Sequence, residues 1–95
     1  MAIYSTDFAK VFSRLIEKYN LSYYQVSQFS GLDQAYLSRL KSGEKKNPSP
    51  ETVVKISLAT CHLNNKVQLS DIEELFNSTG RSLVFHRSKG EVNRL

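Results

Sequence analysis

The spacing of helix-boundary residues between Ser22 and Gly43 restricts the fold of this chain more than any other feature. Ser22 and Gln25 form an S-x-x-Q pattern, which is typical of a capping box at the start of a helix. Gly31 predicts the end of that helix, because glycine adopts the left-handed conformation after a helix without strain. Asp33 follows as a second N-cap, and Gly43 closes the segment that it opens. The stretch therefore predicts two short helices joined by one tight turn.

The second of these helices, about residues 34–42, has two chemically different sides. At roughly 100° per residue, Leu37 and Leu40 share one side, which must be buried. The opposite side carries Gln34, Ala35, Ser38, Arg39 and Ser42. The amide, guanidinium and hydroxyl groups of this side can hydrogen-bond base edges and phosphates. Two helices around a glycine turn are typical of the helix-turn-helix motif, whose second helix enters the major groove. The alternative is a polar face that is only solvated, as most such faces are.

Length and charge indicate one domain and are compatible with a polyanionic partner. The 95 residues are enough for a single core, and the formal net charge of +4 also occurs in proteins that never meet nucleic acid. No apolar run approaches the roughly 18 residues of a membrane span, and no signal peptide is indicated, so we expect a cytoplasmic protein without membrane contact. Cys61 is the only cysteine, and the sequence indicates no metal site and no cofactor.

Helical periodicity predicts three further helices, and hence an all-α fold of five. Apolar residues recur at helical spacing from Phe8 to Tyr19, with Ser5 or Thr6 as the cap. Ser49 and Pro50 begin a fourth helix. Its apolar side is expected to bury Val53, Val54, Ile56, Leu58 and Ala59, with Cys61 semi-buried near its end.

A second capping box over residues 70–73 predicts the start of the fifth helix. We expect its apolar side to consist of Ile72, Leu75 and Phe76. Gly80 is expected to end it.

Residues 81–95 differ in character from the rest of the chain. Leu83, Val84 and Phe85 form a short β-prone run between basic residues. This tail is a frayed end, a strand that pairs with a second subunit, or a segment that lies on nucleic acid. We therefore expect a helix-turn-helix DNA-binding domain over residues 1–80, followed by a flexible or dimerising tail over residues 81–95.

The order of these signals resembles the Cro/repressor-type helix-turn-helix family, which includes phage repressors, bacterial xenobiotic-response-element-like regulators and many antitoxins. The resemblance covers about residues 8–77. It rests on LS at 21–22, V at 26, SGL at 30–32, YLSRLKSG at 36–43 and NPSPETVVKI at 47–56. It implies a compact, lambda-repressor-like bundle of five helices that binds palindromic operator DNA, usually as a homodimer.

The resemblance also implies roles for individual residues. Base-contacting positions of the family fall on Gln34, Ala35, Ser38 and Arg39. Phosphate-contacting positions fall on Ser22, Tyr23, Tyr36, Ser42, Lys45 and Lys46. Tyr23 departs from the family, which often has a glutamine there that braces the recognition helix. Ser27 stands where the family usually has alanine, and Phe29 where it commonly has a charged residue.

Two functions remain open from the sequence. The first is a repressor-like regulator of transcription that binds specific double-stranded DNA and has no catalytic activity. The second is an antitoxin or adaptor whose main role is to bind a protein partner, and it is motivated by Tyr24, Phe29 and the run at 83–85. An enzyme is disfavoured, because the carboxylates are scattered and no glycine-rich phosphate loop is present.

Overall fold

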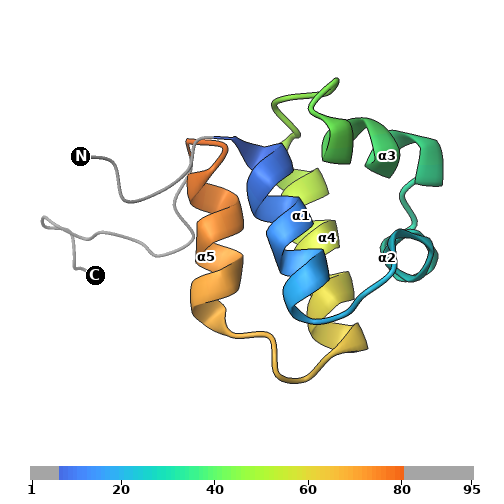
Figure 1. Ribbon diagram of the computed structural model, residues 1–95, viewed down its shortest axis with the longest axis vertical. Helices are drawn as coiled ribbons and strands as arrows, with labels where there is room; N and C mark the ends of the chain where they lie inside the picture. Colours follow the sequence, from blue (N-terminus) through green and yellow to red (C-terminus); the bar gives the residue numbers. More distant parts are fainter. Residues whose placement is uncertain (1–6, 81–95) are drawn as a thin grey trace, which may run out of the picture.

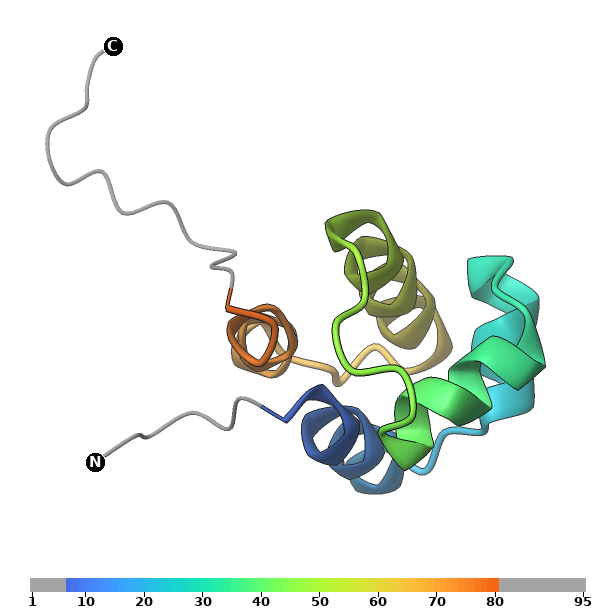
Figure 2. The same cartoon turned by 90° about the horizontal axis from the view of Figure 1, so that it is seen from above.

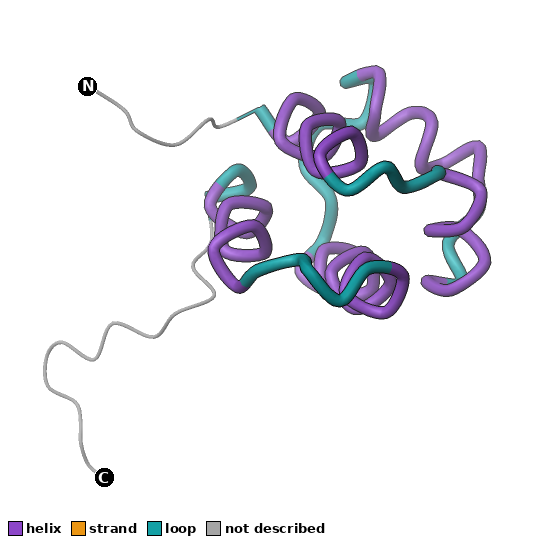
Figure 3. Tube along the Cα trace, turned by 60° about the horizontal axis from the view of Figure 1, so that its bottom comes forward, coloured by secondary structure: helices purple, strands orange, loops and turns teal. Residues whose placement is uncertain are grey.

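The computed structural model describes residues 7–80, which form five helices without a strand. The helices are α1 (Phe8–Lys18), α2 (Tyr23–Ser30), α3 (Gln34–Ser42), α4 (Pro50–Leu63) and α5 (Leu69–Asn77). Helices α1, α4 and α5 lie side by side, and α2 and α3 lie together at one side of them (Figure 1). Short connections join the helices (Figure 3). The expected all-α bundle of five helices is therefore confirmed.

The hydrophobic core lies where the five helices meet. Helix α1 packs on α3 and α5, α2 packs on α3 and α4, and α4 also packs on α5. The view from above shows the helices arranged around this centre (Figure 2). The largest fully buried side chains include Phe8, Phe12, Leu37, Leu40, Ile56 and Leu75. Helix α3 is thus anchored by side chains from both of its neighbours rather than lying free on the surface.

Several helix boundaries lie where the sequence predicts them. The hydroxyls of Ser22 and Ser49 accept backbone N–H groups from the first turn of the following helix at 3.0 and 3.2 Å. Pro50 is the first residue of α4. Gly31 and Gly43 have φ angles of 77° and 86°, in the left-handed region that favours glycine. These local signals fix the ends of α2 and α3 and the start of α4.

The start of α1 corrects one expectation. The N-cap is Asp7, whose carboxylate accepts the backbone N–H of Ala9 at 3.0 Å. The prediction of Ser5 or Thr6 as the cap is therefore wrong. Carboxylates are as effective as hydroxyls at this position, so the residue nearest to the first apolar side chain takes the role.

Both ends of α5 also differ from the prediction. The helix begins at Leu69 because the backbone N–H of Gln68 donates to the Asp71 carboxylate at 3.0 Å, so the capping box starts two residues before Ser70. The helix ends at Asn77 rather than running to Gly80. Gly80 nevertheless has a positive φ of 79°. The expected apolar side of Ile72, Leu75 and Phe76 is buried.

Helix α4 is less completely buried on its apolar side than expected. The exposed fractions of Val54 and Leu58 are 43% and 67%, and Cys61 is exposed. The buried side instead includes polar residues whose hydroxyl groups donate hydrogen bonds to backbone carbonyls of the same helix. Ser57 donates to a backbone carbonyl one turn earlier at 2.7 Å, and Thr60 donates to the Ser57 carbonyl at 2.9 Å. Such bonds make it inexpensive to bury a hydroxyl.

Within residues 7–80, every helix is too short or too polar to cross a membrane. The alternatives for the tail over 81–95 fall outside the described residues.

Candidate nucleic-acid interface

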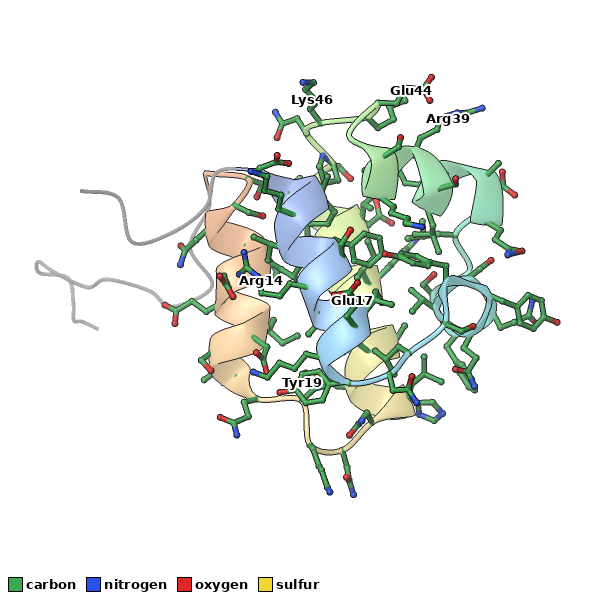
Figure 4. The ribbon with its side chains drawn as sticks, viewed as in Figure 1. Arg14, Glu17, Tyr19, Arg39, Glu44 and Lys46 are labelled. Carbon is green, nitrogen blue, oxygen red and sulfur yellow. The ribbon has the colours of Figure 1, made fainter. Side chains whose placement is uncertain are left out.

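Helix α3 presents one polar side to solvent and inserts the other into the core. Leu37 and Leu40 have exposed fractions of 0%. Gln34, Ala35, Ser38, Arg39 and Ser42 are all exposed. The predicted division of this helix is thus confirmed, and Arg39 points away from the bundle (Figure 4). A rigid helix with an outward polar side is the geometry that a major-groove reader requires.

Serine side chains lock the turn between α2 and α3. The Ser27 hydroxyl donates to the Leu32 carbonyl at 2.6 Å, and the Leu32 N–H donates to the Ser30 hydroxyl at 3.1 Å. Leu32 packs against the core. The resemblance identifies Ser27 only as a residue that stands where the family usually has alanine. A signal for the observed bond is nevertheless present in the sequence, because serine near a turn commonly bonds to backbone groups a few residues away.

The end of α3 is tied to the loop that follows it. Ser42 donates its hydroxyl to the Arg39 carbonyl at 3.1 Å and accepts the Glu44 N–H at 3.3 Å. The Lys45 N–H also donates to the Arg39 carbonyl, at 3.1 Å. These bonds hold the lysine loop against the last turn of α3. A phosphate that took a hydrogen bond from Ser42 would have to displace the Arg39 carbonyl.

The basic residues of this region have no carboxylate partner within the described part of the chain. The ion pairs found between residues 7 and 80 join Arg14 to Glu74, Lys18 to Asp71 and Lys55 to Glu51. None of them involves α3 or the loop over 43–49. Arg39 and Lys46 project from the same end of the molecule, together with Glu44 (Figure 4). Unpaired cations on a rigid helix and its adjoining loop are available to phosphate groups.

Tyr23 lies between α1 and α3. Its half-buried ring meets Phe12 edge-on, with 5.3 Å between ring centroids. The Lys41 ammonium lies 5.2 Å from the Tyr23 ring centroid, a cation–π contact that places the N-terminus of α2 beside the C-terminal end of α3. The ring therefore supplies a brace for α3 where the expected amide is missing.

Burial raises the pKa of the Tyr23 hydroxyl, and the nearby Glu17 charge raises it further, while a hydrogen bond with Ser13 lowers it. The net direction is upward, so the phenol stays protonated near neutral pH. A protonated phenol can donate to a phosphate oxygen.

The other predicted phosphate contacts have different surroundings. Ser22 is exposed and its oxygen accepts the Gln25 N–H, which leaves its own proton to donate outward. Tyr36 is half-buried and packs against the core. Lys45 and Lys46 are exposed in the loop. The predicted contacts therefore come from the start of α2, from α3 and from the loop after it.

An exposed aromatic patch lies on α2, apart from the polar side of α3. Tyr24 and Phe29 have exposed fractions of 58% and 55%. The Phe29 ring stacks on His62 of α4, with 4.4 Å between the ring centroids. Phe29 thus leans over the edge of the bundle while more than half of it remains open to solvent.

Residues 7–80 contain no group of three or more His, Cys, Asp or Glu side chains placed to hold a metal ion. A family model described as helix-turn-helix, of the Cro/C1 type, matches residues 13–60, about half of the chain. That range begins within α1 and ends within α4, so it includes α2, α3 and the turn between them. A comparison with proteins of curated function and one with solved structures found no match.

Proposed function

Because this chain belongs to the Cro/C1-type helix-turn-helix family, which implies DNA binding, we propose that it is a repressor-like transcription regulator that recognises specific double-stranded DNA. The observation that carries the proposal is the outward polar side of α3 above the buried Leu37 and Leu40. Helix α3 would lie in the major groove of an operator. Regulation then follows from occupancy of the operator, without catalysis.

Four residues of α3 would read bases: Gln34, Ala35, Ser38 and Arg39. Arg39 suits the O6 and N7 atoms of guanine, and Gln34 suits the N6 and N7 atoms of adenine. Each such pair is worth about 1–3 kcal/mol of discrimination against a wrong base. Ala35 offers a methyl contact, as to thymine, and Ser38 offers a hydroxyl that suits several bases.

Phosphate contacts would set affinity and register. We assign this role to Ser22, Tyr23, Tyr36, Ser42, Lys45 and Lys46. The exposed lysines of the loop and the outward proton of Ser22 support the assignment most directly. For Ser42 the contact requires exchange of its bond to the Arg39 carbonyl. Because these groups touch only the backbone of DNA, they act on all sequences alike.

We further propose that residues 1–80 act as the DNA-binding unit and that the protein binds a palindrome as a homodimer. One copy of α3 contacts few base pairs, and two copies on half-sites about 34 Å apart would multiply the specificity. This spacing is one turn of B-DNA, so both copies would approach the same face of the duplex.

Selection of bound duplexes from a random pool by the full-length chain tests the proposal. We expect one enriched sequence with two-fold symmetry. Repeating the selection with Gln34→Ala should relax one position in each half-site and preserve the rest. A matched control, Gln28→Ala, changes an exposed glutamine of α2 and should leave the enriched sequence unchanged. Failure to enrich any sequence would refute specific binding, and identical selections with Gln34→Ala would remove α3 as the reader.

A second function is supported by the exposed aromatic side chains of α2. Tyr24 and Phe29 lie on a helix that the family model includes, and large exposed apolar side chains mark protein contacts. The protein would then act as an antitoxin or adaptor that holds a protein partner. A stoichiometric partner that co-purifies with the natural chain and is lost with Phe29→Ser would favour this function. Operator binding by the isolated chain at the same affinity in both variants would favour the first.

A further inference from the structure

The solvent side of α4 carries an apolar stripe that no described residue covers. Val54 and Leu58 have exposed fractions of 43% and 67%, and Cys61 is exposed one turn beyond Leu58. The spacing i, i+4, i+7 places these residues, the α4 stripe, in one line along the helix. Single exposed apolar residues are ordinary, but a contiguous apolar line on the solvent side of a helix is a candidate contact surface.

The neighbours of α4 show where this stripe lies. His62 stacks on Phe29, so that side of α4 faces α2. Around the helix, His62 lies about 40° from Leu58 in one direction and Val54 lies about 40° in the other. Helix α5 is the other element that packs on α4. The stripe therefore runs along the side of α4 that is turned away from α2 and towards α5.

The described part of the chain ends just past α5, at the end of the bundle where α4 begins (Figure 1). Helices α4 and α5 run in opposite directions, so the short segment that follows α5 lies at this end (Figures 1 and 2). From there an extended chain reaches about 10 Å at Leu83 and about 20 Å at His86. Along α4, Val54 lies about 6 Å and Cys61 about 17 Å from Pro50. Packed helices lie about 8–10 Å apart, so a straight extended path of about 20 Å covers both the step from α5 to α4 and the rise to Cys61, and the run Leu83–Phe85 lies within that path.

Charge also favours this placement. Helix α5 contains Asp71, Glu73 and Glu74 and no basic residue. Asp71 and Glu74 are paired with α1, and Glu73 has no ion pair among the described residues. The apolar run is flanked by Arg81 and Arg87. A basic segment that lies beside an acidic helix gains electrostatic attraction in addition to apolar contact.

We propose that the segment Leu83–Val84–Phe85 docks on the α4 stripe of its own chain, alongside α5. In this arrangement the tail completes the apolar cover of α4, which the five helices leave open. The docking is independent of DNA binding by α3, because the two surfaces share no residue.

A disulfide between the tail and Cys61 tests the proposal in the full-length chain. A disulfide requires Cα atoms within about 7 Å, and a tail docked in an extended conformation brings His86 to the level of Cys61 and carries later residues past it. The variant His86→Cys keeps the apolar run intact. Under mild oxidation at low micromolar protein we expect a disulfide within one chain, identified by intact mass and non-reducing peptide mapping.

The matched variant Asn93→Cys carries its thiol in the same tail, past the docked segment. Docking should make the His86→Cys bond form at least about tenfold faster, because it raises the effective concentration of one thiol at the other. Adding Leu58→Ser to His86→Cys should reduce the rate to that of Asn93→Cys. Adding Tyr24→Ser, which changes an aromatic side chain of α2 that is 58% exposed, should not reduce the rate. Both second sites are exposed, so neither change threatens folding.

Equal rates for the two tail cysteines, or a rate that is insensitive to Leu58→Ser, would overturn the proposal. Disulfides that form between chains would overturn it as well, and would assign the stripe to the tail of a second copy.

Discussion

Two surfaces of this molecule differ in whether their positive charges form ion pairs with carboxylates. Between α1 and α5, a guanidinium nitrogen of Arg14 lies 2.8 Å from a carboxylate oxygen of Glu74. The ammonium nitrogen of Lys18 lies 3.0 Å from a carboxylate oxygen of Asp71. On α3 and the loop after it, Arg39 and the neighbouring lysines have no carboxylate partner among the described residues. A cation that is paired within the fold helps to hold two helices together. A cation that is left unpaired on a rigid helix keeps its charge for an external anion, and this difference separates the scaffold from the proposed interface.

Asp71 is the centre of the paired surface. Its carboxylate accepts hydrogen bonds from the Tyr19 hydroxyl, the Lys18 ammonium and the Gln68 N–H. The Asn64 amide donates to the Tyr19 carbonyl at 3.2 Å, which ties the end of α4 to the same point. One carboxylate thus joins the end of α1 to the start of α5, and the connection from α4 lies beside it. Figure 4 shows Tyr19 at this end of the bundle, opposite to Arg39.

These contacts shift the pKa values of the residues that share them. Partial burial alone would raise the pKa of Asp71, but the hydrogen bonds from Tyr19, the Gln68 N–H and Lys18 together lower it. The hydrogen bond to Asp71 is also the main reason that the pKa values of Lys18 and Tyr19 are raised. All three shifts favour the form in which the carboxylate is charged and its two donors keep their protons.

The largest effect is expected from Leu40, which holds α3 in the core. Leu40→Ala should lower the free energy of unfolding by about 2–5 kcal/mol, because it leaves a cavity beneath α3. Urea denaturation measures this loss. Leu69→Ala changes a leucine that is 66% exposed and should alter the free energy of unfolding by less than about 0.5 kcal/mol. Similar losses for the two variants would show that α3 is not held by the core.

Replacing one arginine on each surface by alanine tests the comparison directly. Arg39→Ala should cost about 1–3 kcal/mol of discrimination at one operator position and leave the urea midpoint unchanged. Arg14→Ala removes an exposed ion pair, so it should lower stability by at most about 1 kcal/mol and leave operator preference intact. Binding titrations on matched and mismatched duplexes, together with urea curves, measure both. An Arg14→Ala variant with altered base preference would contradict the division between the two surfaces.

Lowering the pH should weaken the contacts between α1 and α5 before it affects those that hold α3. Because the folded state lowers the pKa of Asp71, the stability that this carboxylate contributes is present above its ordinary value, about 3.9, and is lost as pH falls through the lower folded value. Asp71→Asn should therefore reduce the thermal midpoint at pH 7, and its difference from the natural chain should shrink at about pH 3. Glu73→Gln, which removes a carboxylate without an ion pair among the described residues, is the control. A constant difference across this range would exclude the charge of Asp71 as the cause.

The smallest effect is expected from the lysine loop. Lys45→Ala should weaken binding to all sequences alike and lower the slope of log affinity against log salt by about one. Lys66→Ala removes an exposed lysine between α4 and α5 and should leave the slope unchanged. DNA-binding titrations at several salt concentrations measure this slope. A change in base preference with Lys45→Ala would indicate a direct contact with bases.

The sequence predicted those parts of the fold whose causes are local. Ser22, Ser49 and the two glycines set helix boundaries through bonds and angles that reach no further than one turn. The alternation of Leu37 and Leu40 with polar residues likewise predicted which side of α3 is buried. The exposed positions of the proposed base-reading residues followed from the same wheel, whereas their roles rest on the resemblance and remain to be tested.

Other features depended on segments that are distant in sequence. The wheel of α4 predicted a broad apolar side that includes Val54 and Leu58, but α2 and α5 cover only part of it. Asp71 accepts a hydrogen bond from Tyr19, which lies 52 positions away in the sequence. No local pattern indicates that pairing. The amino-acid sequence by itself determined where α2, α3 and α4 begin and which side of α3 is apolar, because caps, glycines and helical periodicity act within a few residues. Only the tertiary structure decided which apolar surface stays open and which charges are paired, because both depend on how the helices pack together.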